Sequence, residues 1–329
     1  MKYLITGATG FIGPYLIKRL TNEGHQCRCL VRDMKKAQHL MDIHGVEVVP
    51  GDITKPDTLK GIAEGVDVLF HLATLGHMSN FTVTEEMFEA VNVMGTRNIM
   101  AQAMASNVPR VVHCSSVAAM GICREVPATE TTPCRPHHPY GRSKLKGEEA
   151  VTTLVKNHSL PAVILRFSMV YGPGDWRDML KLTRYAKKGI FPKIGNRPKL
   201  TPLIHIKDVV EALILAARNG RPGERYLITN GASIPFDRLR QLILKGLEIS
   251  RFPLYVPEAP ALWAADLMEK LWTNMGKAPP VTRKNIESTL SDRVFSIDKA
   301  RRELGFSPVI DTETGIVETV KWYKEKGWV

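Results

Sequence analysis

The hydrophobic residues of the chain follow two spacings, and each spacing predicts one kind of element. Short, continuous apolar runs predict buried strands, whereas apolar side chains that recur every three or four positions predict helices with one buried face. The run at residues 3–5 is followed at helical spacing by Ile12, Leu16, Ile17 and Leu20. Further strands are predicted at residues 25–32, 46–53, 66–73, 111–116 and 162–166.

Strands and helical patterns alternate along the first half of the chain, which predicts βαβ units. Strands joined in this way pair in parallel, with right-handed crossovers. We therefore predict an α/β protein with a doubly wound parallel sheet. Stretches rich in proline and glycine near 133–139, 171–174 and 189–202 are interpreted as loops rather than as linkers between separate domains,.

Three glycines separate the first predicted strand from the first predicted helix. Gly7 is expected to form a tight turn, Gly10 to let the backbone approach a pyrophosphate, and Gly13 to let the helix pack closely,. The free N–H groups at the start of such a helix attract phosphate. The order strand, glycine turn, helix therefore predicts a dinucleotide-binding site.

The composition is that of a soluble globular protein. Of 329 residues, 44% are hydrophobic and 24% are charged, and no apolar run is long enough to span a bilayer,. Met1 and Lys2 lead directly into the first strand, so we expect no secretory signal and a cytoplasmic protein. The five scattered cysteines are interpreted as reduced thiols, and no metal site is expected,.

The formal net charge of +12 is the one unusual bulk property. Much of it comes from residues 177–199, which carry eight lysines and arginines against Asp178 alone. The first interpretation is a solvated surface; the alternative is attraction to an anionic substrate or an anionic membrane surface. Nucleic acid is not expected as a partner, because no nucleic-acid-binding motif accompanies this charge.

The second predicted strand ends at Arg32, which bears on the choice of cofactor. At this position of a nicotinamide enzyme an acidic residue binds the ribose 2′-hydroxyl, whereas an arginine suits a 2′-phosphate. Arg32 therefore favours NADP, although Asp33 follows it and leaves NAD open.

Tyr140 and Lys144 form a Tyr-x-x-x-Lys pattern, which puts both side chains on one face of a helix,. A tyrosine hydroxyl normally loses its proton only near pH ~10, so an unperturbed tyrosine cannot act as a base at neutral pH. A lysine four residues away favours the phenolate, so we expect Lys144 to lower the pKa of Tyr140.

These motifs together resemble the extended short-chain dehydrogenase/reductase family, and the resemblance covers nearly the whole chain. It is carried by Thr6–Gly13, by Ser116 five residues before Gly121, by Tyr140 and Lys144, and by Tyr171-Gly-Pro-Gly-Asp175. The resemblance implies a Rossmann domain at 1–165 that recurs near 203–230. It also implies a smaller, interleaved substrate-binding lobe at 166–329, and a homodimer.

The resemblance also implies roles for particular residues. Tyr140, Lys144 and Ser116 would be catalytic, with Ser115 as the alternative to Ser116. Lys144 would also hold the nicotinamide ribose. The cofactor-binding residues would be Gly7, Thr9, Gly10, Phe11, Ile12, Gly13, Arg32, Asp52, Ile53, Leu72, Ala73, Tyr140 and Lys144.

The chain departs from the sugar-nucleotide branches of this family. Val117-Ala118 stands where the dehydratases have Asp-Glu, which argues against dehydration. Met169 replaces an asparagine and Thr201 an arginine that hold nucleotide sugars in the epimerases. With His205 these residues are our candidates for substrate contact. The apolar segment 260–272 suggests an apolar lobe, or else an ordinary amphipathic helix, and the pattern is most similar to the 3β-hydroxysteroid dehydrogenase-like branch.

The leading hypothesis is therefore an NAD(P)-dependent oxidoreductase that interconverts a secondary alcohol and a ketone on a largely apolar, sterol-like or hydroxy-ketone substrate. The alternative is a sugar or nucleotide-sugar epimerase that uses the same residues. A third hypothesis, from another class, is an NADP-binding sensor without turnover.

Overall fold

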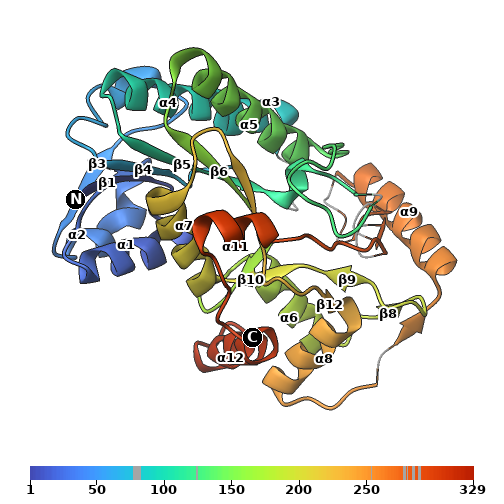
Figure 1. The fold of residues 1–329 in the computed structure, drawn as a ribbon. Coiled ribbons are helices and arrows are strands. Elements are labelled where there is room, and N and C mark those ends of the chain that lie inside the picture. Colours follow the sequence, from blue (N-terminus) through green and yellow to red (C-terminus); the bar gives the residue numbers. More distant parts are fainter. Residues whose placement is uncertain are drawn as a thin grey trace.

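The computed structural model describes residues 1–76, 83–123, 125–252, 254–276, 279, 281–283, 286–287 and 290–329. Within these residues the largest sheet has seven strands in the order β11-β6-β5-β4-β1-β2-β3, and all neighbours are parallel (Figure 1). This sheet confirms the predicted fold class. The strands are β1 (Lys2–Thr6), β2 (Gln26–Val31), β3 (Val46–Pro50), β4 (Val68–His71), β5 (Arg110–Ser116), β6 (Ala162–Phe167) and β11 (Arg225–Ile228).

The predicted strands are present, and their ends differ by a few residues. The third prediction extended to residue 53, whereas β3 ends at Pro50. It ends there because the Asp52 carboxylate accepts hydrogen bonds from the backbone N–H and the hydroxyl of Thr54, which forms a turn,. β6 is buried along its whole length, as the apolar run at residues 162–165 predicts, and its one charged residue, Arg166, is paired with Glu148,.

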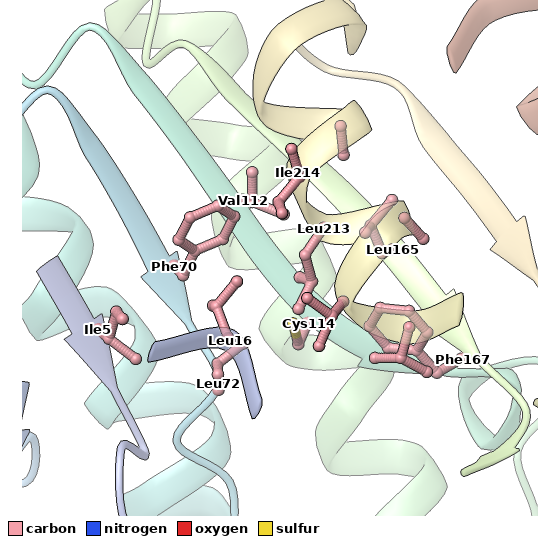
Figure 2. Close-up of a cluster of buried hydrophobic side chains, with 14 of the residues drawn as sticks. Ile5, Leu16, Phe70, Leu72, Val112, Cys114, Leu165, Phe167, Leu213 and Ile214 are labelled. Atoms are coloured by element: carbon pink, nitrogen blue, oxygen red, sulfur yellow. The ribbon is translucent and has the colours of Figure 1, made fainter. Parts of the chain in front are cut away.

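Helices cover both faces of this sheet (Figure 1). One face packs against helices α1 and α7, and the other against α4 and α5. Figure 2 shows Leu16 of α1 and Leu213 of α7 among strand residues that include Phe70 and Val112. The helices around the sheet are α1 (Ile12–Asn22), α2 (Gln38–Met41), α3 (Glu85–Phe88), the π-helical turn η3 (Glu89–Met94), α4 (Gly95–Ala105), α5 (Pro139–His158), α7 (Ile206–Asn219) and α11 (Asp298–Leu304).

A second, smaller lobe packs around its own apolar core. This core is built mainly from three helices, α6, α8 and α12, which lie together in Figure 1. Short strands form three two-stranded sheets, β10-β7, β12-β9 and β13-β8. The elements of this lobe are β7 (Met169–Tyr171), α6 (Asp178–Lys188), β8 (Lys193–Ile194), β9 (Leu200–Thr201), β10 (Leu203–His205), β12 (Ile234–Pro235), α8 (Phe236–Leu247), β13 (Tyr255–Val256), α9 (Glu258–Asn274) and α12 (Thr312–Glu325).

The chain passes between the two lobes more than once. α7 and β11 follow the first part of the smaller lobe in sequence but pack on, or pair with, the large sheet. The apolar segment 260–272 lies in α9, where Ala261 and Ala265 are buried while Trp263 is 69% exposed. Among the described residues, no helix is both long enough and apolar enough to cross a bilayer.

Candidate functional site

The glycine turn joins β1 to α1 with two close backbone contacts. Gly7 has φ of 72°, and a Cβ atom there would lie 2.7 Å from the Ala73 nitrogen. A Cβ atom at Gly13 would lie 2.3 Å from the Ala8 carbonyl oxygen. Both positions therefore require glycine, one for the left-handed turn and one for the approach of the helix to the loop.

The start of α1 fits the pyrophosphate of a dinucleotide. The residue at its N-terminal cap is Phe11, and no side chain caps the helix there. The first N–H groups of such a helix seek an acceptor, and an anion is a suitable one. A Cβ atom at Gly10 would meet only the Gly7 carbonyl oxygen, at 3.1 Å, so the loop is open on that side.

Further residues expected to contact the cofactor lie at the ends of β2, β3 and β4. Arg32 is exposed directly after β2, and the Asp33 carboxylate accepts a hydrogen bond of 3.0 Å from the Lys35 backbone N–H. Asp33 is therefore engaged in its own turn. Ile53 is buried against Gly95, and the Ala73 N–H donates to the Thr6 hydroxyl at 3.1 Å.

Ser116 and Tyr140 meet at the carboxyl end of β5. Ser116 is the last residue of β5, and its hydroxyl accepts a hydrogen bond from the Ala118 N–H at 3.1 Å. Tyr140 is the second residue of α5. Burial raises the pKa of the Tyr140 hydroxyl, whereas a hydrogen bond with Ser116 and the charge of Arg177 act to lower this pKa.

Lys144 lies one turn further along α5 and is 3% exposed. Its ammonium group donates a hydrogen bond of 2.7 Å to the Cys114 carbonyl of β5, and burial lowers its pKa to about 8. We expected Lys144 to lower the pKa of Tyr140. In the structure that pKa is raised instead, and the groups that act to lower it are Ser116 and Arg177. Burial is the main cause of this rise, and the Lys144 ammonium group, which donates to the strand carbonyl, is not among the groups that shift the pKa of Tyr140.

Two buried histidines lie close to Lys144. His71 and His113 are stacked with ring centroids 5.3 Å apart, on the neighbouring strands β4 and β5. Burial is the main cause that holds both pKa values below the usual range, that of His71 at about 3, and the charge of Lys144 lowers them further. Both rings are therefore neutral near pH 7, and they add no positive charge beside the lysine.

Asn92 connects the π-helical turn η3 to α5, and it was not among the residues predicted for the site. It is buried, and its amide group donates to the Ser143 hydroxyl at 2.9 Å and to the Leu75 carbonyl at 3.1 Å. A Cβ atom at Gly147 would lie 2.7 Å from the Asn92 carbonyl oxygen. The signal that could have revealed Asn92 is its position inside a helix, where a buried amide needs specific partners.

The base of the site is held by a buried ion network. Ser115 donates a hydrogen bond of 2.5 Å to the Glu148 carboxylate, which Arg166 contacts through two nitrogens. Arg225 of β11 contacts the same carboxylate at 3.2 Å. Ser115, the alternative to Ser116, is thus engaged in a structural network below the site.

The three candidates for substrate contact lie in two different small sheets. Met169 and His205 lie on the paired strands β7 and β10, whereas Thr201 lies on β9 opposite Ile234. His205 is buried, accepts a hydrogen bond from the Lys207 N–H at 3.3 Å, and packs edge-on against Tyr171. Burial lowers the pKa of its imidazole to about 4. In this position His205 caps α7.

The fold and the glycine turn together define a dinucleotide-binding enzyme, and the comparisons with known proteins identify its family. The chain belongs to the NAD dependent epimerase/dehydratase family, whose model matches residues 3–229. It is an NAD(P)-dependent oxidoreductase of the extended short-chain dehydrogenase/reductase type, with relatives similar to 3β-hydroxysteroid dehydrogenases.

Individual relatives are similar over almost their full length. A ketoreductase of a farnesylated dihydroquinoline oxide from Stigmatella aurantiaca is 30% identical, over 96% of this chain and 95% of that protein. A 3β-hydroxysteroid dehydrogenase/Δ5→4-isomerase from Mycobacterium tuberculosis is 29% identical, over 98% of this chain and 90% of that protein. The crystal structure of gox2253 superimposes with a TM-score of 0.83 at 30% identity, over 99% of both chains.

Proposed function

We propose that this enzyme interconverts a secondary alcohol and a ketone on a largely apolar substrate, with Ser116, Tyr140 and Lys144 at its active site. The observation that carries the proposal is the position of Tyr140 beside Ser116 at the carboxyl end of β5, where the Ser116 hydroxyl acts to lower the pKa of Tyr140. In doubly wound sheets, ligands bind at the carboxyl ends of the strands. The relatives named above as a ketoreductase and a dehydrogenase support this reaction class.

Each side chain has a distinct task in ketone reduction. Because burial raises the pKa of Tyr140, its hydroxyl keeps its proton at neutral pH and can donate that proton to the carbonyl oxygen,. The Ser116 hydroxyl donates a hydrogen bond to the same oxygen and stabilises the charge that develops there. Lys144 would hold the nicotinamide ribose. When bound, the reduced nicotinamide supplies the hydride that the carbonyl carbon accepts.

For the cofactor we propose NADP in preference to NAD. Arg32 is exposed at the end of β2, Lys35 and Lys36 are exposed beside it, and Asp33 is engaged in its own turn. An arginine can pair with a 2′-phosphate through two hydrogen bonds. Fluorescence titration should therefore show tighter binding of NADPH than of NADH, and Arg32→Asp should remove this difference. Equal affinities in the parent enzyme would contradict the proposal and leave NAD as the cofactor.

For the substrate we propose an apolar hydroxy or keto compound. Met169 and Thr201 stand where the sugar-nucleotide enzymes of the resemblance have an asparagine and an arginine. A buried diphosphate without such partners costs several kcal/mol, whereas each buried methylene group contributes about 0.8 kcal/mol.

One cavity favours the epimerase alternative. A space of about 280 Å³ between the 191–199 segment and the start of α8 is lined by Lys193, Arg197, Lys199, Arg238 and Arg240, with Asp237 as the acidic residue among them. Arg238 pairs with Glu313 and Arg240 with Asp237. The remaining three cations could bind the phosphates of a nucleotide sugar.

Calorimetry with the NADP complex decides between the two enzymes. Apolar ketones should bind with micromolar affinity, and UDP-glucose and UDP-galactose should not. Micromolar binding of a UDP-sugar, with no heat of binding from the ketones, would favour the epimerase. A stable NADP complex without turnover across a broad substrate screen would favour the sensor hypothesis.

We propose an anionic membrane surface as a further partner, at a patch that comprises Ile190, residues 251, 252, 254 and 255, and α9. Phe252 is fully exposed, and Leu254, Trp263, Leu267 and Leu271 are between 42% and 69% exposed. Arg251 lies against Gly189 at the end of α6, next to the exposed Lys187 and Lys188. Exposed apolar residues beside cations suit an anionic lipid surface.

Vesicle sedimentation tests this partner. The enzyme should sediment with vesicles that contain phosphatidylglycerol and much less with pure phosphatidylcholine. Phe252→Asp and Trp263→Asp should release it, whereas the exposed Val309→Asp outside the patch should not. A parent enzyme that stays in the supernatant would refute the proposal. We also propose a homodimer, as the resemblance implies, which light scattering can check, and a cytoplasmic location, which cell fractionation can check.

A further inference from the structure

The segment 173–177 of the smaller lobe lies across the glycine turn of the large domain. It connects β7 to α6. The Tyr15 hydroxyl, in the first turns of α1, donates a hydrogen bond of 2.7 Å to the Pro173 carbonyl. The Trp176 ring meets the Phe11 ring edge-on, with centroids 6.3 Å apart. The contact joins residues that are more than 150 positions apart in the sequence.

Within this segment the Arg177 side chain is held in one direction. Its Nε donates a hydrogen bond of 2.9 Å to the Asp175 carboxylate, which is completely buried, and one terminal nitrogen donates to the Val170 carbonyl at 3.4 Å. Asp175 is fixed in turn by the Tyr323 hydroxyl, which donates to its backbone carbonyl at 2.6 Å. These contacts use two of the five N–H donors of a guanidinium group.

The guanidinium group lies over the ring of Phe11, 5.0 Å from its centroid. Phe11 is the cap residue of α1, where no side chain satisfies the first N–H groups. The positive charge of Arg177 therefore stands beside the positive end of a helix, and the two favour the same anion. The Arg177 side chain is 43% exposed, so the remaining donors are accessible to a ligand.

We propose that Arg177 binds the pyrophosphate of the nicotinamide cofactor and so ties the smaller lobe to the bound nucleotide. The inference rests on the proposed cofactor site. The same charge also acts on the Tyr140 hydroxyl, so one arginine serves both the cofactor and the proton donor. Arg32 and Arg177 then have separate tasks, because the 2′-phosphate occurs only in NADP whereas the pyrophosphate is common to NAD and NADP.

Titration of NADPH and NADH against parent, Arg177→Gln and Arg32→Asp enzymes tests this division. Arg177→Gln should weaken both cofactors by the same factor, about tenfold or more, since a charged hydrogen bond is lost. The salt dependence of the affinity should also decrease, a change that a purely structural role would not cause. Arg32→Asp should alter the ratio between the cofactors. Lys156→Gln, an exposed charge in the last turn of α5, is the control and should leave both affinities unchanged.

Three outcomes would overturn the inference. Unchanged affinities in Arg177→Gln would show that the arginine does not contact the cofactor, and a loss for NADPH alone would assign it to the 2′-phosphate. If Arg177→Gln fails to fold, the double change Asp175→Asn with Arg177→Gln removes the buried carboxylate together with its partner, and parental affinity for both cofactors in that variant would also refute the inference,. If the parent binds neither cofactor, the proposed function itself fails.

Discussion

Burial displaces the pKa values of Tyr140 and Lys144 in opposite directions. Burial makes the Tyr140 phenol harder to deprotonate and the Lys144 ammonium easier to deprotonate. In both cases the reason is that the charged form loses its solvation,. Tyr140 is thereby suited to donate a proton, and Lys144 titrates close to physiological pH. Each displacement leads to a measurable expectation.

We predict that Tyr140→Phe binds NADPH with parental affinity and loses nearly all turnover. The change removes only the hydroxyl, and a positioned acid contributes about 10²- to 10⁴-fold to the rate. Steady-state kinetics on an accepted ketone, together with fluorescence titration, measures both quantities. Retention of even a tenth of the parental activity would mean that another group supplies the proton.

We predict that NADPH binding weakens as the pH rises through about 8, the pKa to which burial lowers Lys144. Below this pH the ammonium is charged and attracts the anionic cofactor; above it the charge is lost, and a charged contact of about 1.4 kcal/mol corresponds to a tenfold loss of affinity. Of the neighbours, Glu148 and Cys114 act to raise the pKa of Lys144, and His71 and His113 are neutral.

Titration between about pH 7 and pH 9.5 checks this expectation. Lys144→Met should bind weakly at every pH and show a flat profile. A parent enzyme whose affinity is equally flat would contradict the assignment. The free energy of unfolding depends on pH in the opposite direction. The unfolded lysine keeps its proton up to its ordinary pKa of 10.5, whereas the folded one loses it near pH 8. The contribution of Lys144 to stability therefore rises between about pH 8 and 10.5,.

At the scale of elements, successive turns of α5 contribute to the candidate site and to the stability of the fold. Tyr140 and Lys144 face the candidate site, and one turn further Glu148 anchors the helix to β6 and β11 through Arg166 and Arg225. The Glu148 side chain is fully buried, and Arg166 is 3% exposed. Since the same carboxylate accepts from Ser115, the network also fixes the end of β5 that carries Ser116.

We predict that Glu148→Gln lowers the free energy of unfolding by about 3–5 kcal/mol, because it leaves the Arg166 charge buried without a counter-charge. Urea denaturation followed by circular dichroism measures the loss. Glu149→Gln, on the exposed neighbour in the same helix, is the control and should change little. If the two variants are equally stable, the network contributes nothing beyond what solvent would supply.

At the scale of the whole molecule, the large sheet depends on chain that comes after the smaller lobe has begun. α7 contributes Val209, Leu213 and Ile214 to the main apolar cluster, which also contains Phe306 (Figure 2 shows Leu213 and Ile214). The outermost strand on one side, β11, lies later still. The proposed Rossmann domain at 1–165 is therefore incomplete without these later segments.

We predict that a fragment of residues 1–165 does not fold. One face of its sheet would lose the cover of α7. Each Å² of apolar surface left in water costs about 25 cal/mol, so we expect this loss to exceed the free energy of unfolding of a typical domain. Circular dichroism and gel filtration of the fragment beside the full chain test it. A fragment with a cooperative thermal transition would show that 1–165 is an independent domain.

The sequence by itself determined the class of fold, the glycine turn and the family. These depend on local information: a strand, a turn with φ of 72° at Gly7, and a helix face can each be recognised from a few neighbouring residues,. Met169 and Thr201 could likewise be found by comparing motifs. The placement of Ser116 at the end of β5 follows from the same kind of pattern.

Only the tertiary structure decided which distant groups meet. Nothing near Arg177 in the sequence indicates that it lies over Phe11, and nothing near Lys144 indicates that its ammonium group turns to the Cys114 carbonyl. Nothing near His205 in the sequence indicates that its ring is buried against Tyr171. The physical reason is that charge, burial and hydrogen bonding at these positions are set by segments far apart in the chain, which come together only when both lobes pack.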